Sequence, residues 1–201
     1  MTGASPSVLD DPRWHVFNQA GFQCSCGERH VGLFPLHMQL PRGWPIAPVF
    51  EPNSAIRMEG NFLSHDFSVQ DGQFFAMRMR LPISMQGMGP VVIMYTVWGA
   101  MDQPDFEAFV KATLEGTMNG KVHAPGRLAN NISGYTSSAN LLGTSFQQDD
   151  GGYPLLLLHG PQDANDPNHL LLHEQRHGIS LDRALELFAA YGHDMRASAS
   201  V

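Results

Sequence analysis

The chain has 201 residues, which suits one domain that buries a hydrophobic core without disulfides or a structural metal. Its 12 basic and 19 acidic side chains give a formal net charge of −7, so neither a nucleic-acid backbone nor an anionic membrane surface is expected as a partner. No apolar run approaches the ~20 residues of a membrane span, and residues 1–11 lack the features of a secretory signal. Two cysteines one residue apart favour a reduced, cytoplasmic protein without disulfides.

Residues 1–20 predict an N-terminal tail followed by a short helix. The first eleven residues are small and polar, which is typical of a disordered end. Asp11 is expected to cap the helix, with Pro12 at its first position, and Gly21 is expected to end it.

A candidate metal site follows this helix. Cys24, Cys26 and His30 lie within seven residues, and thiolate and imidazole are ligands that Zn²⁺ prefers. Gly27 permits a tight turn that directs them toward one point. The usual spacing has two or more residues between the cysteines, whereas only Ser25 stands there. The alternative is a tight turn with two ordinary buried thiols. Candidates for a fourth ligand are His37, His65, and one of the group His169, His173 and His177.

The next segments predict strands and one hairpin. Five prolines in residues 35–54 indicate an extended segment without regular structure. Residues 63–69 and 75–81 alternate between apolar and polar side chains, as in half-buried strands. A three-residue turn at residues 70–72, with Gly72 left-handed and a bulge, keeps the apolar faces together. It predicts these pairs: Phe67 with Phe75, and His65 with Met77.

The C-terminal half completes an α+β pattern. Residues 90–98 are apolar without alternation, which is typical of a strand covered on both faces. Ser180 is expected to cap a final helix that ends at Gly192. The other predicted elements are a helix over 103–116, strands over 127–132, 138–146 and 153–159, and a hairpin turn at 149–152. We therefore expect a single α+β domain over residues 21–192, mainly an antiparallel sheet of about six strands with two or three packed helices, and a frayed tail over 193–201.

A second metal pattern lies at residues 173–177. His173 and His177 with Glu174 fit the H-E-x-x-H motif of zinc peptidases, in which both histidines share a helix face and the glutamate acts as general base. The extended motif needs another ligand downstream, but its positions hold Ser180 and Arg183, and arginine cannot ligate a cation. Glu186 could serve as that ligand only if a second helix folded back onto the first.

The helix that carries this pattern is also short. Gly178 follows His177 directly and is expected to end the helix, which leaves about two turns for a metal scaffold. We therefore favour a surface helix that carries His169, His173 and His177 as a hydrated stripe.

Several short motifs follow one another in a recognisable order. They are Phe22-x-Cys-Ser-Cys-Gly-x-x-His-x-Gly-Leu33, Phe74-Phe75 with Leu81-Pro82-Ile83, Val97-Trp98-Gly99 before Phe106, Leu128-x-Asn130 with Gly134-Tyr135, and His169-Leu170, Glu174-Gln175 and Gly178-Ile179-Ser180. In this order the chain resembles the bacterial family of domains of unknown function numbered 2199, from about residue 22 to residue 187.

The resemblance implies no established activity. It implies a Cys-x-x-Cys-Gly-x-x-His turn, which this chain matches with one residue fewer between the cysteines. At the C-terminal end the family motif corresponds to His169, Gln175, Gly178 and Ile179, whereas His173 and His177 fall outside it. The resemblance therefore disfavours the peptidase interpretation.

Two functional hypotheses result. The first is a non-catalytic binding or interaction module for a protein or small molecule, stabilised by zinc at Cys24, Cys26 and His30, with His169 as a nearby fourth ligand. The second is a zinc hydrolase that uses His173, His177 and Glu174. We favour the first because the sequence has no nucleophile elbow, phosphate loop or closely spaced carboxylate pair. Five methionines suit either an adaptable contact face or, as we favour, a sheet core: Met77, Met79, Met85, Met88 and Met94.

Overall fold

A computed structural model of the chain describes residues 8–44, 55–89, 91–117, 122–159 and 169–194. These residues belong to two units. The first unit consists of Met1–Leu36, Ile83–Met94 and His173–Val201, and the second of His37–Pro82 and Tyr95–Leu172. Three predicted features lie partly outside the described residues: the start of the N-terminal tail, the second half of the proline-rich segment, and residues 195–201 of the C-terminal tail.

The chain contains four α-helices, two short helical turns and eleven strands in its described part. The helical segments are η1 (Val8–Asp10), α1 (Pro12–His15), η2 (Val16–Ala20), α2 (Gln103–Leu114), α3 (Leu170–His177) and α4 (Leu181–Ala190). The strands are β1 (Phe22–Gln23), β2 (Arg29–His30), β3 (Leu36–His37), β4 (Ala55–Met58), β5 (Asn61–Ser64), β6 (Phe67–Gln70), β7 (Phe74–Ser84), β8 (Val92–Met101), β9 (His123–Leu128), β10 (Leu142–Phe146) and β11 (Leu155–Leu158). Every helix in these residues is too short or too polar to cross a lipid bilayer.

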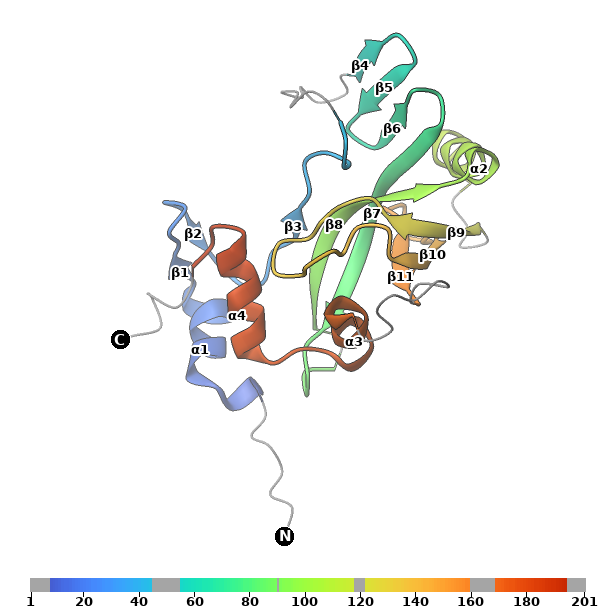
Figure 1. The fold of residues 1–201 in the computed structure, drawn as a ribbon. Helices are drawn as coiled ribbons and strands as arrows, with labels where there is room; N and C mark the ends of the chain where they lie inside the picture. Colours follow the sequence, from blue (N-terminus) through green and yellow to red (C-terminus); the bar gives the residue numbers. More distant parts are fainter. Residues whose placement is uncertain (1–7, 45–54, 90, 118–121, 160–168, 195–201) are drawn as a thin grey trace. The chain divides into compact units, whose positions relative to one another are not determined.

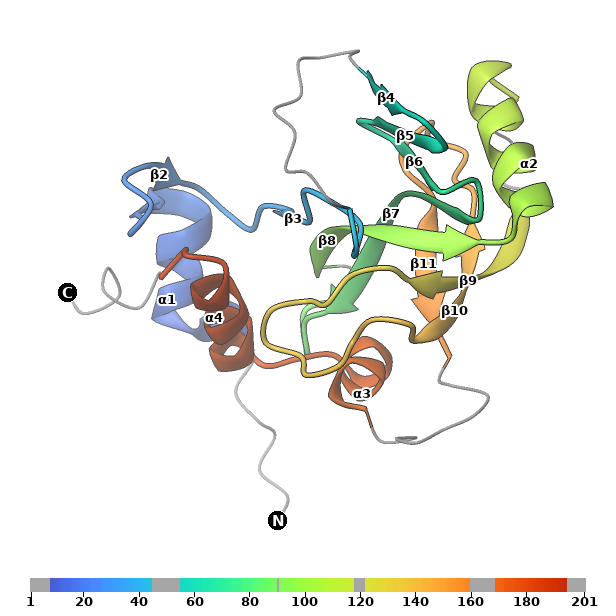
Figure 2. The same cartoon turned by 45° about the horizontal axis from the view of Figure 1, so that its top comes forward.

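The α+β class is confirmed, but the expected simple sheet of about six strands is wrong. The main sheet has nine strands in the order β3-β8-β9-β10-β11-β7-β6-β5-β4, and β8 also pairs with β7 (Figures 1 and 2). Strands β7 to β11 therefore form a closed, barrel-like ring of five strands. Strand β11 runs parallel to β7, with Leu155 opposite Arg80. Closure of the ring pairs strand edges that would be exposed in an open sheet. The sequence pattern did not predict it, because alternation along one strand does not indicate which distant strand pairs with it.

The hairpin of β6 and β7 has the predicted loop length but a different register. The loop consists of Asp71, Gly72 and Gln73, because Gln70 pairs with Phe74. Asp71 and Gly72 both have positive φ, at 52° and 63°. Starting the loop one residue later brings other partners together than expected: Phe67 lies opposite Met77 and Val69 opposite Phe75. The apolar faces still match, since the shift moves each residue by an even number of positions.

The predicted strand over residues 63–69 is interrupted at His65 and Asp66. The Ser64 hydroxyl accepts hydrogen bonds from the backbone N–H groups of Asp66, at 3.3 Å, and Phe67, at 3.0 Å. Such local side-chain bonds compete with strand pairing, so β5 ends and β6 starts anew. This turn places the His65 and Asp66 side chains beside Tyr153.

Both faces of β7 are covered, although alternation had predicted one face in water. Ala76 and Arg78 are buried, and Ala76 belongs to a core cluster with Trp98 and Trp44. Segment 38–44 supplies this cover, since Met38 and Leu40 pack against the same cluster. On the other face, Phe106 of α2 packs against Phe67 and Phe75, with ring centroids 5.9 and 5.5 Å apart.

The expected strand over residues 127–132 is wrong, since β9 lies at His123–Leu128, and the strand expected over 138–146 begins only at Leu142. Strand β8 and the methionines agree with expectation. Strand β8 is covered on both faces, because Tyr95 and Val97 are buried on one face and Thr96 and Trp98 on the other. Four of the five methionines are core residues as favoured above: Met77, Met79, Met85 and Met88.

In the first unit, helices α1 and α4 lie side by side (Figures 1 and 2). Arg13 of α1 donates to Asp182 of α4 at 2.6 Å. The predicted caps are both present, because the Asp11 carboxylate accepts from Arg13 N at 2.9 Å and the Ser180 hydroxyl accepts from Arg183 N at 3.2 Å.

Candidate metal centre

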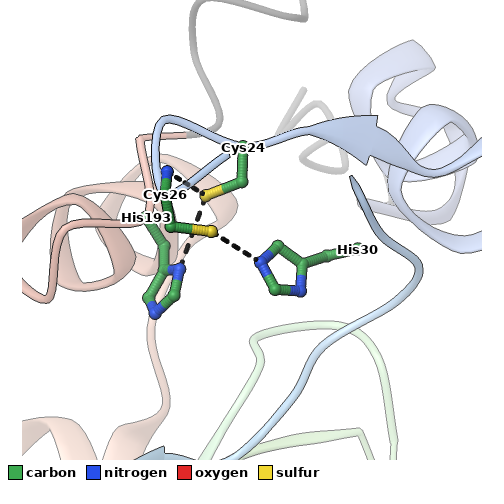
Figure 3. A group of neighbouring side chains, drawn as sticks. All are labelled: Cys24, Cys26, His30 and His193. Atoms are coloured by element: carbon green, nitrogen blue, oxygen red, sulfur yellow. Dashed lines mark hydrogen bonds between the residues drawn. The ribbon is translucent and has the colours of Figure 1, made fainter. Parts of the chain in front are cut away.

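A two-stranded hairpin holds the cysteine turn. Phe22 of β1 pairs with His30 of β2. At the tip, Cys24 N donates to Glu28 O at 2.8 Å, and Gly27 N donates to Cys24 O at 3.0 Å. Gly27 adopts φ +92°, which a residue with a Cβ rarely adopts, so glycine allows the tight turn that the sequence predicted. The turn brings Cys24, Cys26 and His30 to one side of the hairpin (Figure 3).

Ser25, the single residue between the cysteines, binds the end of the last helix. Its hydroxyl donates to the carbonyl of Gly192 at 2.9 Å and accepts from Asp194 N at 3.0 Å. The short cysteine spacing therefore has a structural use, because the intervening side chain anchors residues 192–194 beside the turn.

The end of α4 delivers a fourth candidate ligand, His193. Gly192 N donates to Ala189 O and His193 N donates to Phe188 O, both at 3.0 Å, and Gly192 has φ +80°. This pair of bonds around a left-handed glycine is the Schellman motif of helix C-termini. The motif turns the chain so that His193 Nδ1 lies 3.4 Å from Cys24 Sγ.

Four donor atoms converge at this place. Cys26 Sγ lies 3.2 Å from His30 Nε2, and the ligand atoms of Cys24, Cys26, His30 and His193 all lie within 4.8 Å of one another (Figure 3). The edges of a tetrahedron of two sulfurs and two nitrogens around Zn²⁺ measure roughly 3.3–3.8 Å, given the usual bond lengths. The two S···N pairs at 3.2 and 3.4 Å are close to these edges, and all separations in the group stay within 4.8 Å. The four residues could therefore hold one metal ion.

Aromatic packing fixes the two imidazoles. The His30 ring stacks on Phe34, with centroids 4.4 Å apart, and Phe34 also contacts His193 and Phe188 at 4.9 Å. Burial, together with the neighbouring His30, holds the pKa of His193 below its ordinary value. His193 is therefore held in the neutral form that binds metals.

The cysteines differ in exposure. Cys24 is buried and Cys26 is exposed. The backbone N–H of Cys26 also points at Cys24 Sγ from 3.5 Å, and such donors stabilise a metal-bound thiolate. Cys24 thus lies on the protein side of the centre and Cys26 on the solvent side.

His169, predicted as a nearby fourth ligand, has another environment. It is buried, its Nε2 lies 2.8 Å from Thr136 O, and its Nδ1 accepts from Leu171 N at 3.2 Å. Both ring nitrogens are thus engaged within the second unit, where they hold the start of α3. The other suggested ligands, His37 and His65, also belong to the second unit and are not members of the converging group.

The H-E-x-x-H stretch does form a helix, and Gly178 ends it as predicted, with φ +75°. His173 and His177 are exposed, with their rings 4.5 Å apart on one face. The expected hydrated stripe is thus correct for these two residues and wrong for His169, whose ring caps α3. Among the described residues, the converging group of possible metal ligands does not include His173 or His177.

Glu174 is a packed, ion-paired residue. It is 7 % exposed, and its carboxylate accepts from Arg183 Nε at 2.9 Å. Arg183 also bonds Glu186 at 3.1 Å. Arg183 stands where the extended motif has its downstream metal ligand, and its guanidinium instead neutralises the charge of Glu174.

The sequence predicts His193 in a frayed tail, whereas the structure brings it to Cys24. The signal was present: an amphipathic helix that ends in glycine predicts a Schellman motif, and the residue after that glycine packs back on the last turn.

The fold and the centre define an α+β protein with a candidate Cys₂His₂ metal site. The sequence model of a family described as an uncharacterised protein conserved in bacteria, DUF2199, matches residues 23–179. The chain belongs to this family, as its motifs had suggested. Cys24, Cys26 and His30 lie within the matched residues, and His193 lies beyond them. Comparisons with curated proteins and with solved structures gave no match.

Proposed function

We propose that the protein is a binding module in which Cys24, Cys26, His30 and His193 hold a structural zinc ion. One observation carries this proposal: the ligand atoms of these four side chains lie within 4.8 Å of one another. Thiolate and imidazole together select Zn²⁺ over the harder divalent cations.

A set of four protein ligands favours a structural role over a catalytic one. Catalytic zinc sites commonly keep one position open for water or substrate, whereas structural sites are closed by four side chains. Zinc bound here would supply folding free energy. Because Cys24 and His193 are 169 residues apart in the chain, that free energy would hold the end of α4 on the hairpin.

The observations at residues 173–177 do not favour the hydrolase alternative. Glu174, the intended general base, is paired with Arg183. A base must reach a metal-bound water, and the pairing instead holds this carboxylate against α4. We therefore propose action through binding, with a protein or a small molecule as partner.

The test is the metal content of the purified protein and of matched variants. We expect about one zinc per chain, lost in Cys24→Ser, Cys26→Ser and His193→Ala and retained in the control with His173→Ala and His177→Ala. Absence of zinc in protein purified without chelators, or its loss only in the control, would refute the proposal.

Removal of zinc with a chelator tests whether the ion stabilises the fold. If zinc is structural, its removal should lower the unfolding midpoint of the wild type and leave that of Cys26→Ser unchanged. Equal midpoints with and without zinc would contradict the structural role.

A further inference from the structure

A pocket of about 370 Å³ opens in the second unit, independent of the zinc site. Its walls combine three apolar side chains, Phe67, Met77 and Pro154, with Arg78 and the polar group His65, Asp66 and Tyr153. This volume lies within the range of small-molecule sites, which are mostly apolar with a few placed polar groups.

Arg78 brings a buried positive charge to this wall. It is 6 % exposed, and its guanidinium donates to the carbonyls of Met38 at 3.0 Å, Gln39 at 3.2 Å and His65. Within the described chain, no carboxylate lies within 4.0 Å of it. Burial of a charge is costly and lowers the pKa of Arg78, whereas Tyr153 and the charge of Asp66 act in the opposite direction.

The surrounding groups add polar side chains and one carboxylate. The pKa of His37 is lowered by partial burial, by the charge of Arg78 and by His65, so two imidazoles lie near the guanidinium. Asp66 Oδ1 lies 2.7 Å from His65 Nδ1 and accepts from the Tyr153 hydroxyl at 2.9 Å. Burial and the Asp66 bond raise the pKa of Tyr153 to about 12, so its hydroxyl keeps its proton at neutral pH.

We propose that this pocket binds a small organic carboxylate with an apolar body. The carboxylate supplies the direct ion-pair partner that Arg78 does not have among the described residues, and the body lies against Phe67, Met77 and Pro154. A phosphate dianion fits less well, because such ligands are held by several cations or backbone N–H groups, and here Asp66 would repel the second charge.

Three probes of nearly equal shape test the charge requirement on the wild-type protein: benzoate, benzamide and benzylamine. Titration calorimetry should give benzoate at least about tenfold tighter binding than benzamide, and benzylamine the weakest. Shifts of the Gly151 and Gly152 amide resonances should place benzoate at this pocket. Benzamide equal to benzoate, benzylamine tightest, no binding of benzoate, or shifts elsewhere would each overturn the proposal.

A charge variant provides an independent check. Asp66→Asn removes the one carboxylate of the pocket wall and should tighten benzoate binding about threefold or more, with benzamide unchanged within about twofold. Asp71→Asn is the matched control, since it removes the same charge from the hairpin loop outside the pocket and should change neither probe. Weaker or unchanged benzoate binding in Asp66→Asn would contradict the proposal.

Discussion

The hydroxyl of Ser25 donates a hydrogen bond of 2.9 Å to the carbonyl of Gly192, although 167 residues separate them. The same hydroxyl accepts from Asp194 N at 3.0 Å, so one side chain holds both neighbours of His193. Fixing the backbone on each side of a ligand restricts where its imidazole can lie. Ser25, the single residue between the cysteines, therefore positions the fourth candidate ligand.

Ser25→Ala should weaken zinc binding about tenfold without abolishing it, because groups that orient metal ligands typically contribute 10–100-fold to affinity. Competition with a chromogenic chelator measures this. Ser25→Thr keeps the hydroxyl and should stay close to the wild type. Equal affinity in Ser25→Ala would show that the bonds to residues 192 and 194 do not organise the site.

Gly192→Ala should destabilise the first unit mainly in the zinc-bound protein. Gly192 has φ +80°, and a Cβ there would meet no atom within 4 Å, so the cost is backbone strain of roughly 1 kcal/mol. Because His193 follows in the same motif, the strain should also weaken zinc binding. The measurement is denaturant unfolding with and without chelator; a loss of the same size in both would disprove the link.

Gly72→Ala is the complementary case in the β6–β7 loop. Gly72 has φ +63°, and an added Cβ there would also meet no atom within 4 Å. The substitution should therefore lower the free energy of unfolding by about 1 kcal/mol through backbone strain, with or without zinc. An unchanged unfolding midpoint would contradict the left-handed loop.

Glu174→Gln should cost about 1–3 kcal/mol of stability, because it leaves Arg183 without its buried charge partner. Glu186→Gln is the matched control on the same guanidinium. Its side chain is 58 % exposed, so it should cost less than about 1 kcal/mol. Denaturant midpoints distinguish the two, and a peptidase activity that Glu174→Gln removes without loss of stability would restore the hydrolase interpretation.

The raised pKa of Tyr153 should make the protein less stable at alkaline pH. The pKa of this side chain is raised from 10.0 to about 12, first by burial and then by the bond to Asp66. Its contribution is complete below pH about 10, where folded and unfolded chains are both protonated, and is lost as pH rises toward about 12. After allowance for the solvent around this partly exposed group, the loss should be roughly 1 kcal/mol. Unfolding free energies of wild type and Tyr153→Phe across this range should diverge accordingly; parallel curves would contradict the shift.

Local signals in the sequence predicted local structure well. Asp11 and Ser180 cap their helices, Gly178 and Gly192 end theirs, and Gly27 makes the cysteine turn, because each depends on neighbours within a few residues.

The long-range features could not be obtained in this way. Ring closure joins β7 to β8 and β11, and the pairing of Leu155 with Arg80 carries no periodic signal. His193 joins the cysteines through Ser25, a contact between the two ends of the chain. Three of the four candidate ligands were therefore predictable. The glycine after α4 predicts the turn that carries His193, but only the fold brings that turn to the cysteines.

X-ray absorption at the zinc edge of the purified protein tests the central claim most directly. A site of Cys24, Cys26, His30 and His193 predicts two sulfur neighbours at about 2.3 Å and two nitrogen neighbours at about 2.0–2.1 Å. A first shell of nitrogen and oxygen without sulfur, as at His173 and His177, or a protein without zinc would contradict it.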